Sequence, residues 1–144
     1  MFSFEKMDIE NIKLVIIKYD QSSQDCVLQI NENENGLFTL ILTYEGISIN
    51  ATSETCFEAL KFIRAKLEKD NLLLKCYGSC VDVYPSPMIL SMGDGRLAYR
   101  LTPGKPASNN DLVDIFDSDE GIILAKIDEQ EKYYNEWLRS IIGN

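Results

Sequence analysis

Side chains able to carry out acid–base or nucleophilic chemistry are few in this 144-residue chain, which contains no histidine. Histidine is the side chain whose ordinary pKa lies near neutrality. Its absence therefore excludes Ser-His and Cys-His nucleophile pairs, histidine-ligated metals and the usual general base. We expect no catalytic residues, no cofactor-binding residues and no metal ligands, and a protein that is not an enzyme.

Four cysteines and one glycine-rich segment are the remaining candidates for redox, metal or nucleotide chemistry. Cys76 and Cys80 have three residues between them, which fits neither a thioredoxin-type site nor a zinc half-site with a matching second pair. We expect reduced thiols in the core or at strand ends. Segment 92–96 (MGDGR) lacks the glycine frame, the lysine and the Ser or Thr of a phosphate-binding loop, and it predicts a tight turn.

Carboxylates are densest between residues 111 and 120. A calcium loop needs oxygen ligands at alternate positions and a closing glutamate twelve residues from the first, a pattern that this segment does not have. Two interpretations stay open: a solvated acidic loop, or a surface that pairs with Lys and Arg of another protein. The acidic residues of this segment are Asp111, Asp114, Asp117, Asp119 and Glu120.

Arg96, Tyr99 and Arg100 form the one basic and aromatic group that could line a pocket. A basic pair beside a tyrosine more often makes an internal salt bridge or stacks on a ring. The alternative function is a small enzyme or ligand-binding domain. That alternative requires a concave pocket that holds all three residues and a carboxylate of disturbed pKa.

The elements that must position these side chains begin with a sheet. Residues 12–19 have apolar side chains on both sides of the alternation, which predicts a strand buried on both faces. Polar turns that include Asn35-Gly36 and Glu45-Gly46 separate this strand and its successors into an antiparallel meander. The four predicted strands are 12–19, 26–30, 37–44 and 47–51.

The hydrophobic period then changes from two to about 3.6 residues. Thr55 and Glu58 form a capping box, and a helix is predicted from 54 to 70 with its apolar face across the sheet. The polar side of that helix is predicted to carry Lys61, Arg64, Lys66, Glu68 and Lys69.

The second half is less regular. A strand is predicted from 72 to 77, and apolar and polar residues continue to alternate at 81–84. Residues 85–106 contain several Pro and Gly residues and are predicted to form an ordered, irregular segment. Short strands are predicted at 97–102 and 112–116. A C-terminal helix is predicted from Asp128 to Gly143. The expected fold class is α+β: an antiparallel β-meander with a helix packed across it and a C-terminal helix.

Length and charge set the outer limits. The chain predicts a single domain, residues 1–144, with a net charge of −9. Residues 111–144 carry nine acidic and three basic side chains, whereas residues 72–110 carry two and four. The negative field disfavours nucleic acid and favours a basic protein, although acidity for solubility alone is an equal alternative. Without an apolar span or signal core, we expect a cytoplasmic protein that does not bind membranes.

Five segments of residues 72–140 are similar to a family of small proteobacterial proteins. Some members of that family look like immunity proteins encoded beside contact-dependent growth-inhibition toxins. The similarity rests on Gly, Pro, Tyr and Trp positions that determine a fold. The segments are 76–79 (CYGS), 83–86 (VYPS), 92–99 (MGDGRLAY), 111–116 (DLVDIF) and 129–138 (EQEKYYNEWL).

The resemblance implies that the protein binds one cognate toxin domain, typically a nuclease, and blocks it without a cofactor. A nuclease presents a basic cleft, so the contact is expected on carboxylates. Meander turns with Asp20, Glu32 and Glu34 are the second choice for this contact. A further alternative is an adaptor that self-associates through an exposed strand or an apolar helix face. The expected partner-binding residues are Asp111, Asp114, Asp117, Asp119, Glu120 and Glu129.

Overall fold

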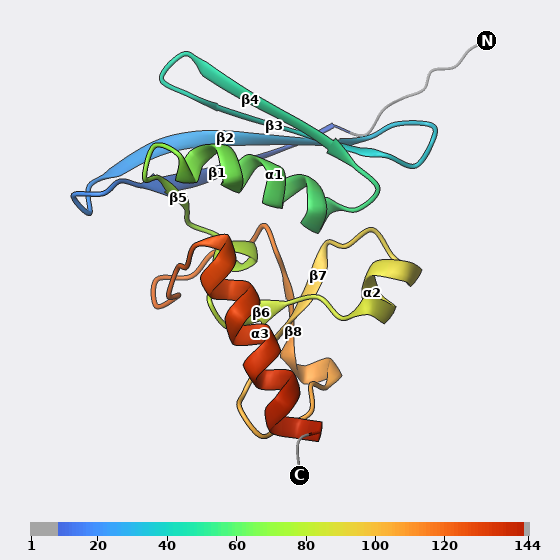
Figure 1. The fold of residues 1–144 in the computed structure, drawn as a ribbon. Coiled ribbons are helices and arrows are strands. Elements are labelled where there is room, and N and C mark those ends of the chain that lie inside the picture. The colour runs from blue at the N-terminus through green and yellow to red at the C-terminus, as the bar shows by residue number, and fades with distance from the viewer. Residues whose placement is uncertain (1–8, 143–144) are drawn as a thin grey trace.

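A five-stranded antiparallel sheet forms the first half of this α+β protein in the computed structural model, which describes residues 9–142 (Figure 1). The strand order is β4-β3-β2-β1-β5. All four predicted meander strands are confirmed, with ends that differ from the predicted ones by up to three residues. The strands are β1 (Ile9–Ile17), β2 (Ser23–Glu32), β3 (Phe38–Tyr44), β4 (Ile47–Ser53) and β5 (Leu73–Leu74).

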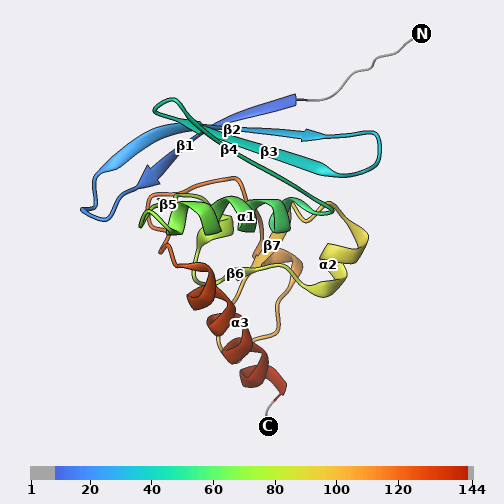
Figure 2. The same ribbon diagram turned by 45° about the horizontal axis from the view of Figure 1, so that its top comes forward.

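The sheet has one buried face and one face toward solvent. Its register pairs Leu14 with Cys26 and Leu28 with Leu42, and these four residues are buried. All three helices lie on this side of the sheet (Figures 1 and 2). The prediction that residues 12–19 are buried on both faces is wrong, since the alternate residues of β1 are only partly buried and no helix covers them.

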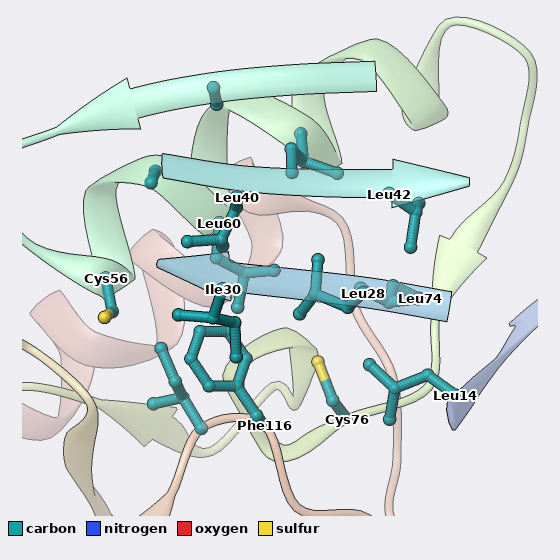
Figure 3. Packing of buried hydrophobic residues seen from close by; sticks show 14 of the residues in the cluster. Leu14, Leu28, Ile30, Leu40, Leu42, Cys56, Leu60, Leu74, Cys76 and Phe116 are labelled. Atoms are coloured by element: carbon teal, nitrogen blue, oxygen red, sulfur yellow. The ribbon is translucent and has the colours of Figure 1, made fainter. Parts of the chain in front are cut away.

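Helix α1 (Cys56–Glu68) covers the inner face of the sheet, as predicted. Thr55 caps it by accepting a hydrogen bond from the Glu58 backbone N–H at 3.1 Å. Leu60 of α1 packs toward Ile30 and Leu40 of the sheet (Figure 3). Phe116 and Cys76, from the second half of the chain, belong to the same hydrophobic cluster, which therefore joins both halves.

Short elements and irregular backbone make up the second half. A three-stranded antiparallel sheet has the order β6-β7-β8. The predicted strand 72–77 is wrong beyond Leu74, because residues 77–79 coil into a 3-10 turn. Helix α2 was missed by the sequence analysis, although Ser86 caps it and Pro87 occupies its first turn. The elements are η1 (Tyr77–Ser79), β6 (Val83–Tyr84), α2 (Pro87–Met92), β7 (Leu97–Arg100), η2 (Asn109–Asp111), β8 (Leu112–Asp114) and α3 (Ile127–Ile142).

Helix α3 is the predicted C-terminal helix, beginning one residue earlier than expected. Its predicted end at Gly143 lies outside the described residues. Tyr134 of α3 stacks on Tyr84 of β6 with ring centroids 4.3 Å apart, and Phe57 of α1 meets Tyr84 edge-on at 5.3 Å. The aromatic contacts thus connect α3 to β6 and β6 to α1.

A buried polar network also joins α1 to the second half. The prediction that Arg64 lies on the polar side of its helix is wrong: this residue is 2% exposed. Its guanidinium donates to the Gly78 carbonyl at 3.0 Å, to the Ala125 carbonyl at 3.0 Å and to Gln130 Oε1 at 2.7 Å. Burial lowers the Arg64 pKa, yet an arginine stays charged. The irregular backbone around η1 supplies the carbonyls that compensate this charge.

Gln130 completes this network from α3. Its side-chain nitrogen donates to the carbonyls of Gly78, Cys80 and Val83 at 2.9–3.0 Å. Gly78 has little room for a side chain, because an added Cβ would lie 2.4 Å from Leu60 Cδ2. The turn at η1 can therefore approach α1 closely only with glycine at this position.

Candidate functional site

An acidic hollow of about 450 Å³ opens at the end of the sheet where β1 begins and β2 ends. Its base includes the buried side chains of Ile30, Phe38 and Cys56. Four charged residues, from three different segments, line it as well. They are Glu10 of β1, Glu32 of β2, Asp94 of the loop after α2, and Arg96 just before β7.

Arg96 is already paired within the protein. Its Nη1 and Nη2 donate to the two carboxylate oxygens of Glu10 at 2.6 and 2.9 Å, and its Nε donates to Asp114 Oδ2 at 2.9 Å. The guanidinium carbon also lies 5.2 Å from the centroid of the Phe116 ring. Hydrogen bonding to Arg96 lowers the pKa of Glu10, and hydrogen bonding to Glu10 raises the pKa of Arg96. This ion cluster connects the first sheet to the second.

Pairing inside the cluster leaves an excess of negative charge in the hollow. Glu10 and Asp114 share the one guanidinium, while Glu32 and Asp94 form no ion pair with any described residue. Asp94 Oδ1 accepts a hydrogen bond from the Arg96 backbone N–H at 2.9 Å, so its carboxylate is held at the rim. A cationic side chain of another molecule would find two carboxylates there that lack a counterion.

The Cys56 thiol lies against this hollow without being an activated nucleophile. Burial first, and the neighbouring Asp94 charge next, raise its pKa to about 12. Burial likewise raises the pKa of Cys26 and of Cys80 to about 12. All four cysteines are free and buried, as the sequence predicted, and they stay protonated at neutral pH.

Four of the six predicted partner-binding residues accept hydrogen bonds inside the protein, and three of these four, Asp111, Asp114 and Glu129, bond to residues two or three positions away. Asp111 accepts from the Ser108 backbone N–H at 3.0 Å. Asp114, besides its pair with Arg96, accepts from the Phe116 N–H at 2.9 Å. Glu129 accepts from the Lys126 N–H at 2.8 Å and so caps α3. These carboxylates shape the second half whether or not they also contact a partner.

The other three lie on one exposed loop after β8. Asp117 and Asp119 are exposed, and Asp119 Oδ1 accepts from the Glu120 backbone N–H at 2.7 Å. The Glu120 side chain is fully exposed and lies 4.0 Å from Lys75. The structure thus groups Asp117, Asp119 and Glu120 on one exposed loop, apart from Asp111, Asp114 and Glu129.

The three acids that were the second choice for partner contact also differ in their surroundings. Asp20 accepts hydrogen bonds from Ser22, which lower its pKa and define the β1–β2 turn. Glu34 is exposed on the β2–β3 turn. Glu32 alone among these three lines the acidic hollow.

Sequence reasoning missed Glu10 and Asp94 as members of this site. Glu10 could have been recognised from the sequence. It lies an even number of residues from Ile12, Leu14 and Ile16, so its side chain is on the same inner face of the strand as these apolar residues. Asp94 gave no such signal. Its place depends on Gly95, which has a φ of +73° and approaches Thr55 so closely that an added Cβ would lie 2.7 Å from the Thr55 Cβ.

Arg96, Tyr99 and Arg100 do not share a pocket of the kind that the alternative function requires. Arg96 lines the acidic hollow, to which neither Tyr99 nor Arg100 belongs. Arg100 lies 3.5 Å from Asp82 and 5.6 Å from the centroid of the Tyr77 ring. Both arginines therefore make the salt bridge and ring contacts that the sequence analysis named as the commoner outcome.

A larger hollow of about 600 Å³ lies at the other end of β1, between the β1–β2 turn and the exposed loop after β8 that carries Glu120. Its charged lining is mixed, with three lysines and two glutamates. Since Ile17, which lines this hollow, and Glu10 are seven residues apart on β1, the two hollows lie about 23 Å apart. The charged residues are Lys18, Lys75, Lys126, Glu68 and Glu120.

No family model matches the chain, and comparison with curated proteins finds no match either. Within residues 9–142, no group of three or more Cys, Asp or Glu side chains has the geometry to hold a metal ion. None of the described helices is both long and apolar enough to cross a membrane. The acidic hollow and the distribution of charge are therefore the guides to function.

Proposed function

We propose that this protein is an immunity protein that binds and neutralises the basic toxin domain, of nuclease type, of a contact-dependent growth-inhibition system in the cytosol. The observation that carries the proposal is the acidic hollow. Glu32 and Asp94 form no ion pair within residues 9–142, and they line the hollow beside buried apolar side chains. A lysine or arginine of the toxin could place its charged end between these carboxylates and its aliphatic part on the base.

The overall charge supports the same partner. A protein of net charge −9 attracts a basic surface over a distance of about a Debye length, roughly 8 Å at physiological salt. Nucleases need positive charge in their clefts because their substrates are polyanions. An acidic inhibitor can therefore compete with phosphates for the same cationic side chains and associate rapidly. No catalytic group is needed for this function.

Two of the five segments that carry the family resemblance contribute to this hollow or to the ion cluster beside it. Segment 92–99 contains Asp94 and Arg96, and segment 111–116 contains Asp114 and Phe116. The paired side chains of Arg96 and Asp114 hold the two segments together at 2.9 Å. We infer that the resemblance marks the structural frame of the hollow, on which exposed acids such as Glu32 select the partner.

Co-expression tests the proposed function directly. The product of the adjacent upstream reading frame should be toxic alone and harmless when this protein is present. A product that is harmless alone, or that still kills in the presence of this protein, contradicts the proposal.

Binding variants test the hollow itself. Glu32→Lys should weaken toxin binding at least about tenfold, because it places a cation where a cation has to dock. Asp25→Lys is the matched control: it makes the same charge change on the exposed face of the same strand. Calorimetric titration at two salt concentrations should show tight binding that weakens with salt. Equal losses for the two variants would leave net charge, rather than the hollow, as the determinant.

A further inference from the structure

The outer edge of β4 is open along its whole length. β4 ends the sheet, and no described residue forms a backbone hydrogen bond with its free side. The two-residue turn at Glu45-Gly46 makes Tyr44 and Ile47 a hydrogen-bonded pair, and such pairs then alternate along the hairpin. The N–H and C=O groups of Ser48, Asn50 and Thr52 therefore point away from the sheet.

This edge lacks the features by which soluble proteins prevent strand pairing. Lysine, proline and β-bulges are the usual means, and the seven residues of β4 (ISINATS) contain no charge and no proline. The register with β3 is continuous from Phe38–Ser53 to Tyr44–Ile47, without a bulge. An incoming strand could pair with β4 without disrupting the sheet.

Helix α1 supplies an apolar flank beside the same edge. It runs back beneath the sheet after β4 (Figure 1), and it packs mainly against β4 and β3. Lys61 and Glu68 identify the side of the helix that faces α3, since they contact Glu131 and the Ile127 N–H. Phe62 lies on the other side by helical spacing and is 51% exposed. Ile47 on β4 is 48% exposed. Two large apolar side chains are thus left open on the flank.

The charges on this flank are arranged for a second copy of the same chain. Glu58, Phe62 and Lys66 follow one another at intervals of four residues, so they form one stripe with an acid at the start and a base at the end. Neither Glu58 nor Lys66 forms an ion pair within residues 9–142. When two such stripes run antiparallel, each Glu58 faces the partner's Lys66.

One two-fold axis can serve both the strand and the helix. Asn50 is the middle residue of β4 and Phe62 the middle residue of α1. The strand is about 23 Å long and the helix about 20 Å, so the two elements that would meet their copies are of similar length. A two-fold axis at Asn50 pairs Ser48 with the Thr52 of the second copy and brings the two Phe62 side chains together.

We propose that the protein forms a symmetric homodimer in which two β4 edges pair antiparallel and the two α1 stripes meet beneath them. The four charged residues of the acidic hollow lie outside β4 and α1, so each copy keeps its own hollow. A dimer would present two hollows, and with them two toxin-binding sites under the proposed function. The dimer itself does not depend on that function.

Analytical ultracentrifugation of the full chain tests the dimer. The expected result is a species of twice the chain mass at about 100 μM, a concentration at which a Kd near 1 μM leaves most chains paired. Phe62→Lys and Asn50→Lys should each weaken the dimer at least about tenfold, because both place like charges at the two-fold axis. Ile123→Lys, at a site that is 70% exposed elsewhere, should leave the dimer unchanged.

A charge exchange makes the test specific. Lys66→Glu should weaken the dimer, and the double variant Lys66→Glu with Glu58→Lys should restore it, since the stripe then has the opposite polarity but the same complementarity. Circular dichroism of each variant checks that the monomer folds. A monomeric wild type overturns the proposal. A dimer that Phe62→Lys and Asn50→Lys leave intact also overturns it. If the wild type is monomeric and Phe62→Lys loses toxin binding, the edge of β4 is a contact for the toxin instead.

Discussion

The two halves of the molecule are stabilised in different ways. Residues 9–68 form a meander and a helix whose apolar residues repeat with the periods of a strand and of a helix, and they bury a regular apolar layer. Residues 75–142 contain short strands and irregular backbone held around Arg64 and Gln130, two buried polar side chains. The first half needs only hydrophobic residues at the right spacing, whereas the second needs specific donors for specific carbonyls.

The largest effect is expected when Arg64, which donates hydrogen bonds to carbonyls of the second half, is removed. Arg64→Ala should lower the free energy of unfolding by about 3–5 kcal/mol, because it leaves a cavity and buried carbonyls without partners. Urea denaturation measures the loss, and hydrogen exchange should show residues 75–142 losing protection before β2 and β3. Lys66→Ala, on the exposed side of the same helix, should change stability by less than about 0.5 kcal/mol. Equal loss of protection in both halves would mean that they unfold as one unit.

The corresponding change in the first half is Leu28→Ala. Leu28 is 0% exposed, between β1 and β3, and its truncation should cost about 2–5 kcal/mol. Val27→Ala, on the solvent face of the same strand where Val27 is 40% exposed, should cost less than about 1 kcal/mol. Similar losses for the two variants in thermal unfolding would contradict a sheet with one buried face.

Gly78→Ala tests how closely the two halves approach each other. The added Cβ would lie 2.4 Å from Leu60 Cδ2 and 3.1 Å from the Ile115 Cβ, and the resulting repacking should cost about 1–3 kcal/mol. Gly121→Ala is the matched control, because nothing lies within 4 Å of its added Cβ. A midpoint of urea unfolding that is as high for Gly78→Ala as for the control would show that η1 can move away from α1.

The smallest effect is expected at the ion cluster between the two sheets. Hydrogen bonding to Arg96 lowers the pKa of Glu10 below its ordinary value of 4.5, so the charged carboxylate stabilises the folded protein. This contribution is complete above pH 4.5 and is lost as the pH falls through the lowered pKa. Because Glu10 is largely exposed, Glu10→Gln should cost less than about 1 kcal/mol at neutral pH. The difference between Glu10→Gln and wild type should shrink as the pH falls; a constant difference would assign it to packing.

The part of the fold that could be predicted follows the same division. The meander strands and α1 were predictable because each buries one periodic face. The turn at Glu45-Gly46 was predictable because Gly46 adopts a positive φ without steric cost, whereas the positive φ of Glu45 is imposed by the hairpin. Residues 75–77 were misassigned as strand, since nothing in the local pattern shows that the backbone must bend to give the Gly78 carbonyl to Arg64.

Of the acids that line the hollow, only Glu32 was named from the sequence. The sequence indicated carboxylates facing a basic partner, and Glu32 was among the second choices. Asp111, Asp114 and Glu129 turned out to accept internal hydrogen bonds. Local composition could not show this, because the sequence does not distinguish a carboxylate that caps a helix from one that is free to contact another protein.

The sequence by itself determined the class of the protein: a strongly acidic α+β chain without histidine, whose apolar periods specify a sheet and a helix across it. Only the tertiary structure decided where that acidity acts. Glu10 and Asp94 are 84 positions apart, and both line one hollow with Glu32 because the loop at Gly95 folds against the start of α1. A periodic pattern is a property of neighbouring residues, but a site whose charged residues come from three separate segments exists only after the halves of the chain have packed together.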